Sequence, residues 1–114
     1  MLELTMAIKA NIVIDQGATY STSIDVTDDA GEPVDLTGYT GAAQMRKHYT
    51  SSNSHAFTVS IANASGVVTL SMNAAVSGNV TAGRYVYDCE LTDAAGTVSR
   101  LVEGIVTITP QVTR

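Results

Sequence analysis

The chain has 114 residues, of which 45% are hydrophobic and only 15% are charged, and its formal net charge is −5. This length suits one domain with its own core, and the hydrophobic content excludes a disordered chain. The acidic balance argues against nucleic acid and anionic membrane surfaces as partners, because both require a basic face. We therefore expect a single domain over residues 1–114.

The cysteine content and the start of the chain indicate which covalent links, metal sites and cellular locations to expect. Cys89 is the sole cysteine, so an intrachain disulfide and a thiolate metal site are both excluded. The first residues lack a basic leader followed by a long apolar run, which is the pattern of a signal peptide. No apolar stretch approaches the roughly eighteen residues of a membrane span. The sequence predicts synthesis in the cytoplasm and no contact with a membrane.

Apolar and polar residues alternate in the first part of the chain, which predicts strands. One strand is expected over residues 8–15 and a second over residues 20–27. A third follows the acidic turn 28–33, with Ala43 and Met45 facing inward and Gln44 and Arg46 outward. The residues expected on the inner face of the first two strands are Ile8, Ala10, Ile12, Ile14, Tyr20, Thr22, Ile24 and Val26.

The second part of the chain predicts two hairpins joined by a short crossover. Residues 57–72 bend at the turn 63–66, and residues 84–109 bend at the turn 93–96. Between the hairpins, residues 73–80 favour one short helical turn capped by Asn73. The last strand is apolar on both faces near its end, so it is expected to lie between partners, and Pro110 stops it.

Tyr85 occupies a special position in the second hairpin. It follows an Ala-Gly bend and shares one face of its strand with Tyr87, Cys89 and Leu91. A tyrosine at the mouth of such a strand is typical of the tyrosine corner in immunoglobulin-like domains.

The sequence predicts seven short strands and no amphipathic helix. This pattern predicts an all-β protein, an antiparallel immunoglobulin-like β-sandwich with Greek-key connections.

Residues 46–55 contain both histidines and two basic residues, which together suggest a possible site. His48 and His55 flank the polar run 50–54, but no cysteine or carboxylate lies beside them at a ligand spacing, so exposed loop histidines are expected. The cluster formed by residues 46–49 contains Arg46 and Lys47 and is predicted to be a solvated strand end. Contact with an acidic partner surface is the alternative.

The acidic residues and the cysteine are not spaced in the sequence as a set of catalytic groups. Asp28, Asp29, Glu32 and Asp35 do not follow the spacing of an EF-hand, so they are interpreted as turn residues rather than calcium ligands. Asp88 and Glu90 share a strand face, and Arg84, Arg100 or Glu103 is the expected neighbour. Cross-strand ion pairs with an arginine are therefore more plausible than glycosidase chemistry. Cys89 is expected to be buried and inert. No catalytic, cofactor-binding or metal-binding residue is predicted.

Four segments together resemble a known group of proteins. They are residues 14–20, residues 34–46 (Val-Asp-Leu-Thr-Gly-Tyr through Met45 and Arg46), residues 82–88 (Ala-Gly-Arg-Tyr-Val-Tyr-Asp) and residues 100–110. They are similar to small virion structural proteins of tailed bacteriophages, notably contractile-tailed phages of cyanobacteria. They also resemble the immunoglobulin-like amino-terminal domain of baseplate upper proteins. The similarity extends from about Ile12 to Arg114.

The resemblance implies a virion protein without enzymatic activity or cofactor, which assembles into a tail, baseplate or capsid. Its expected partners are other phage structural proteins and further copies of itself. Leu2, Leu4 and Met6 either dock on another subunit or complete the domain's own core. The alternative function is a carbohydrate-binding or adhesin-type module for host-surface recognition. Only Tyr39 and Tyr49 are expected outside the core, and this small number of exposed aromatic residues places sugar binding second.

Overall fold

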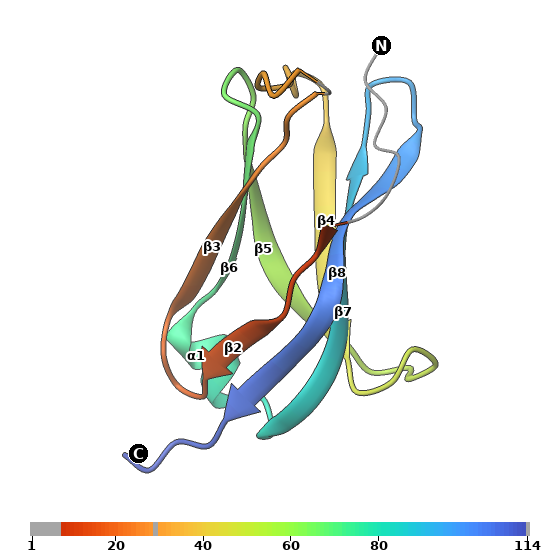
Figure 1. Cartoon of the computed structure of the whole chain (residues 1–114). Helices are drawn as coiled ribbons and strands as arrows, with labels where there is room; N and C mark the ends of the chain where they lie inside the picture. Colours follow the sequence, from red (N-terminus) through yellow and green to blue (C-terminus); the bar gives the residue numbers. More distant parts are fainter. Residues whose placement is uncertain (1–7, 29, 114) are drawn as a thin grey trace.

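The computed structural model describes residues 8–28 and 30–113, and these residues form an all-β protein with one short helix (Figure 1). Residues 2–6, for which we expected a docking or core role, lie outside the described part. The elements follow in the order β1 (Ile8–Lys9), β2 (Ile12–Asp15), β3 (Tyr20–Asp25), β4 (Thr40–Arg46), β5 (His55–Ala62), β6 (Val67–Met72), α1 (Ala74–Gly78), β7 (Gly83–Thr92) and β8 (Val98–Thr109).

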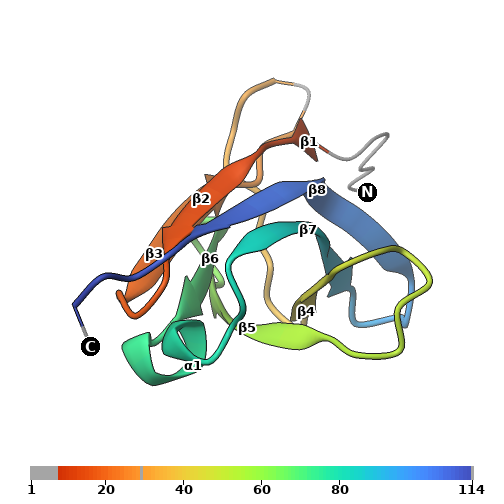
Figure 2. The same cartoon turned by 90° about the horizontal axis from the view of Figure 1, so that it is seen from below.

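The strands form a curled mixed sheet in the order β1-β8-β7-β4-β5-β6-β3, and β2 also pairs with β8. Figure 2 shows the curl, with β8 and β7 on one side and β6 and β3 turned away from them. β5 joins the two parts because its first residues pair with β4, whereas residues 58–62 pair with β6. The sheet therefore encloses a core between its two parts.

Both predicted hairpins are confirmed. β5 and β6 pair antiparallel, as do β7 and β8. β8 lies between β7 on one side and β1 and β2 on the other, which agrees with the prediction of a strand covered by partners. Ile105 is nevertheless 41% exposed, so the outer face of β8 is less covered than its apolar sequence indicates.

The prediction of purely antiparallel pairing was wrong, because β1 and β2 both pair with β8 in parallel. The expected single first strand is also split, which gives eight strands in the described residues instead of seven. The break falls at Ala10 and Asn11. There the Asn11 side-chain Oδ1 accepts the Ile105 N–H at 3.1 Å, so a side chain takes the place of a main-chain partner of β8.

The core confirms the predicted alternation in most strands. The expectation for Ile8 and Ala10 was wrong, since both are exposed at the edge of the sheet. In β7, Tyr85, Tyr87, Cys89 and Leu91 are buried, as predicted. Ala43 and Met45 of β4 also face inward, as predicted. The other buried apolar residues come from both parts of the curl, and they are Ile12, Ile14, Val26, Val34, Leu36, Phe57, Val68, Leu70, Met72, Val80, Leu101, Val102, Val106 and Ile108.

The predicted helical turn is confirmed as α1, with Asn73 as its N-cap. The Asn73 side chain accepts the Val76 N–H at 2.8 Å. Ser77 is fully buried, and its hydroxyl donates to the Ala18 carbonyl at 2.7 Å and accepts the Gly17 N–H at 3.1 Å. These bonds attach the β2–β3 turn to the helix, which fixes one end of the curled sheet.

Candidate functional site

A polar pocket of about 430 Å³ opens at the end of the sheet where β7 begins. In Figure 1 this is the lower end, where the yellow-green loop between β4 and β5 projects. We call it the end pocket. Its walls come from that loop, from the first residue of β5 and from the approach to β7, and they are Lys47, Ser51, Ser52, Asn53, His55, Thr81 and Tyr85.

Tyr85 forms the base of the end pocket. Its ring is 6% exposed, and its hydroxyl donates to the Thr81 carbonyl at 2.6 Å. The His55 ring meets it edge-on, with centroids 5.9 Å apart and planes at 80°. Lys47 Nζ lies 5.0 Å from the centre of the tyrosine ring, within the range of a cation–π contact. Burial raises the pKa of the Tyr85 hydroxyl.

Gly83 makes room for the lysine ammonium. Its φ of +143° is a conformation that side-chain-bearing residues rarely adopt. A Cβ at this position would lie 2.8 Å from Lys47 Nζ. The glycine at the start of β7 therefore lets the charged group lie directly against the main chain.

Hydrogen bonds hold the loop that forms the outer wall. The Arg46 guanidinium donates to the Ser51 carbonyl at 2.8 Å and to the Ser52 carbonyl at 3.3 Å. The His48 N–H donates to Ser51 Oγ at 3.0 Å, and the Ser51 N–H returns a bond of 3.0 Å to the His48 carbonyl. The loop is exposed, as predicted, but it has a defined conformation.

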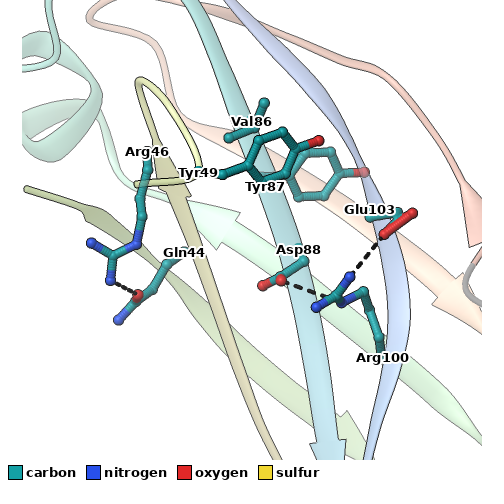
Figure 3. Close-up of a pocket in the computed structure, with 8 residues that line it drawn as sticks. All are labelled: Gln44, Arg46, Tyr49, Val86, Tyr87, Asp88, Arg100 and Glu103. Carbon is teal, nitrogen blue, oxygen red and sulfur yellow. Dashed lines mark hydrogen bonds and ion pairs between the residues drawn. The ribbon is translucent and has the colours of Figure 1, made fainter. Parts of the chain in front are cut away.

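A second, smaller hollow of about 250 Å³ lies on the outer face of the sheet (Figure 3). The predicted cross-strand ion pair is found there, since Arg100 of β8 lies 3.4 Å from Asp88 of β7. Arg100 also lies 3.2 Å from Glu103, which is on its own strand. Because these charges already face one another at the surface, the hollow offers little net attraction for a charged ligand. Its lining residues are Gln44, Arg46, Tyr49, Val86, Tyr87, Asp88, Arg100 and Glu103.

The two histidines do not share one environment. His48 is exposed on the loop, as predicted. His55 begins β5, and its predicted exposure was wrong, since it is half-buried against Tyr85. The cause is the inward direction of alternate β5 side chains, which places His55 on the same face as Phe57. Within residues 8–28 and 30–113, no cluster of three or more possible metal ligands occurs.

The acidic turn shows bonds typical of turns. Asp28 Oδ1 accepts the N–H groups of Ala30 and Glu32 at 2.9 and 3.0 Å. Asp35 Oδ1 accepts the hydroxyl and the N–H of Thr37, and these bonds lower the pKa of Asp35. Asp29 lies outside the described residues. The carboxylates of Asp28 and Asp35 thus stabilise local main-chain geometry.

Cys89 is completely buried, as predicted. Burial, followed by the charges of Asp88 and Glu90, raises the pKa of its thiol to about 11. Since the thiolate is the reactive form of cysteine, the raised pKa keeps Cys89 in its unreactive thiol form at neutral pH.

The sequence-based interpretation did not identify the end pocket, because its residues come from segments that seemed unrelated. Lys47 is predicted at a solvated strand end, His55 beside an exposed polar loop, and Tyr85 in a structural role. A signal was present in the distribution of charge. No acidic residue lies between Asp35 and Asp88, although Arg46, Lys47 and Arg84 lie in that interval. An acid-free stretch with cations in a chain of net charge −5 indicates one locally positive region.

The chain was compared with known proteins. No protein-family model and no curated protein sequence matches it. Among solved structures it is similar to a mutant of the SrpA adhesin of Streptococcus sanguinis, with a TM-score of 0.52 and 16% identity over 88% of this chain. The match covers 55% of the adhesin chain. An internalin-like protein of Listeria monocytogenes gives a TM-score of 0.48 and 13% identity over 90% of this chain and 28% of its own.

The chain therefore spans about half the length of the adhesin structure that it matches. At such low identity the similarity concerns the fold alone, and it agrees with an all-β domain. No helix in the described part of the chain has the length and apolarity needed to cross a membrane.

Proposed function

We propose that this chain is a non-enzymatic structural protein of a tailed-bacteriophage virion, which acts in particle assembly through contacts with other virion proteins and with copies of itself. The sequence segments 14–20, 34–46, 82–88 and 100–110 support the proposal, since they resemble such proteins. In this proposal the curled sheet is an immunoglobulin-like β-sandwich, and the particle contains it as a repeated module.

Two observations support the immunoglobulin-like interpretation. The Tyr85 hydroxyl bonds to the carbonyl four residues upstream, which is the geometry expected of a tyrosine corner. The connection from β3 to β4 and the connection through α1 to β7 both cross between the two parts of the curl. Such crossings are expected in a Greek-key arrangement.

The observation that carries the assembly role is the open edge at β3. Within the described residues this strand pairs with β6 alone, so its other side presents unpaired main-chain N–H and C=O groups. A strand of six residues is long enough to pair with a strand of a neighbouring subunit. Small exposed serines at Ser21 and Ser23 leave that side accessible.

A lysine at the edge tests this role, because edge lysines block strand addition. We expect Ser21→Lys to weaken self-association in sedimentation velocity by about tenfold or more. Ser71→Lys is the matched control, since Ser71 lies directly opposite Ser21 on β6, which is paired on both sides. Equal association of both variants and the parent, with unchanged melting temperatures, would contradict the use of this edge.

Membership of a virion needs a separate measurement. Mass spectrometry of purified phage particles is expected to detect this chain in many copies. Its absence from the particles would end the assembly proposal, whatever the chain does in isolation.

A second candidate function is a surface-binding module of the adhesin type, and the end pocket is the observation that favours it. The pocket is concave, polar and lined by hydroxyl, amide and cationic side chains. The solved structure with the similar fold is named an adhesin. For the present chain, surface binding of that kind is only a candidate function. Robust binding to one sugar class on a glycan array would place this function first.

A further inference from the structure

The end pocket contains a cation without an anionic partner. In the described residues, the ion pairs are the two made by Arg100, so Lys47 forms none. The sequence around the pocket contributes no carboxylate either, since no acidic residue lies between Asp35 and Asp88. The ammonium is therefore available to an external anion.

A cation–π contact places this cation at the pocket wall. Lys47 Nζ lies over the Tyr85 ring and against the glycine main chain at Gly83. The ring in turn is held by its bond to Thr81 and by the edge of His55. A cation–π contact at an exposed site contributes about 0.5–1 kcal/mol, which favours this position of the ammonium.

The remaining walls are suited to hydroxyl groups. Within the described residues, the side chains of Ser52, Asn53 and Thr81 form no hydrogen bond, although all three line the pocket. Each can donate and accept, as sugar hydroxyls require. The loop that presents Ser52 and Asn53 is fixed through Arg46. A volume of about 430 Å³ lies within the range of small-molecule sites and accommodates a single sugar ring.

We propose that the end pocket binds a carboxylate-bearing sugar of the uronic-acid class. Lys47 receives the carboxylate, and Ser52, Asn53 and Thr81 bond the ring hydroxyls. This site lies at the start of β7, whereas the assembly edge lies on β3, so the inference goes beyond the assembly proposal and does not depend on it. It also specifies the ligand that the second candidate function would require.

The test is an NMR titration of the full chain with glucuronate, with glucose as the neutral counterpart of the same ring. We expect saturable amide shifts at residues 47, 51–55 and 81–85 with glucuronate and weaker shifts with glucose. Lys47→Gln is expected to raise the dissociation constant about tenfold, since one charge-assisted contact is lost. Lys9→Gln is the matched control, because it removes an exposed lysine from β1, outside the pocket lining.

Several outcomes would overturn the inference. Equal binding of glucose would show that the carboxylate is not recognised, and equal weakening in both lysine variants would show only a general charge effect. Shifts with a short polyglutamate peptide but none with glucuronate would assign the pocket to an acidic protein partner instead. Because Lys47 is exposed, loss of the fold in Lys47→Gln is not expected, and the dispersion of the remaining amide signals checks it. Absence of the chain from virions would leave these results unchanged, so the two proposals fail separately.

Discussion

Two tyrosine hydroxyls of β7 each donate to a main-chain carbonyl at 2.6 Å, and both rings are almost hidden from solvent. Tyr85 bonds to Thr81, four residues away, and Tyr87 bonds to Ala10, at the break between β1 and β2. The first bond fixes the bend before β7. The second connects the start of the chain to the centre of the sheet.

Tyr85→Phe is expected to lower the free energy of unfolding by about 0.5–1.5 kcal/mol, because the part-buried hydrogen bond to the Thr81 carbonyl is lost. Urea denaturation measures the change. Tyr49→Phe is the control. Tyr49 is 86% exposed, so the loss of its hydroxyl should leave the free energy of unfolding unchanged. Equal stability of Tyr85→Phe and the parent protein would rule out a structural role for the hydroxyl bond.

The raised pKa of Tyr87 predicts that the protein loses stability at alkaline pH. Burial, followed by the neighbouring Tyr20 and Cys89, raises its pKa from 10.0 to about 12. The unfolded chain therefore releases this proton at lower pH than the folded protein, so the free energy of unfolding falls as the pH rises from about 10 to about 12. Denaturation at several alkaline pH values should show a smaller fall in Tyr87→Phe. A residual fall remains through Cys89, and an identical fall in both proteins would contradict the assignment.

For individual residues, the sequence predicted which side chains are buried, but it did not predict which residues they contact. Alternation placed Tyr85 and Cys89 inside, since burial depends on the strand period alone. It could not place Lys47 over Tyr85, because β4 and β7 become neighbours only through tertiary pairing. The pocket depends on such pairing and was therefore not predicted.

Among the elements, the parallel attachment of β1 and β2 to β8 requires close contact at one glycine. Gly104 faces the main chain of Ala10, and a Cβ there would overlap the Ala10 carbonyl group. Ala10 also donates its N–H to the Glu103 carbonyl at 3.0 Å. A small residue at position 104 thus lets the first strands approach β8.

Gly104→Ala is expected to lower the free energy of unfolding by about 1–3 kcal/mol through overpacking at this contact. Gly78→Ala is the matched control, since a Cβ at that position would meet only Gly17 Cα at an ordinary 3.7 Å. Hydrogen exchange should locate the loss, with faster exchange in β1 and β2 than in β5 and β6. Similar stability of the two variants would show that the first strands have room to move away from β8.

The hairpins were predictable and the parallel strands were not, for one physical reason. A hairpin is specified by two adjacent strands and the turn between them, such as residues 63–66. The pairing of Ile8 with Val102 joins the two ends of the chain, and no local residue pattern records its direction. Asn11, which interrupts the first strand, also acts through a distant partner, Ile105.

For the whole molecule, one apolar core connects both parts of the curled sheet. Leu70 of β6 and Val106 of β8 are each fully buried and belong to the same cluster. With Cys89 as the sole cysteine, no intrachain disulfide supports this packing. Stability therefore depends on burial that the two parts share, so neither part is expected to remain folded when the other has lost its packing.

This shared core predicts one cooperative unfolding transition for the single domain. Leu70→Ala should lower the free energy of unfolding by about 2–5 kcal/mol, and Val106→Ala should lower it too, through the cavities that they leave. Both variants should shift the same transition in calorimetry and circular dichroism, with calorimetric and van't Hoff enthalpies in agreement. If β3, β5 and β6 formed an independent unit, Leu70→Ala would instead separate an early transition from a later one that it leaves unchanged. Because Cys89 forms no intrachain bond, the melting temperature should be the same with and without a reducing agent.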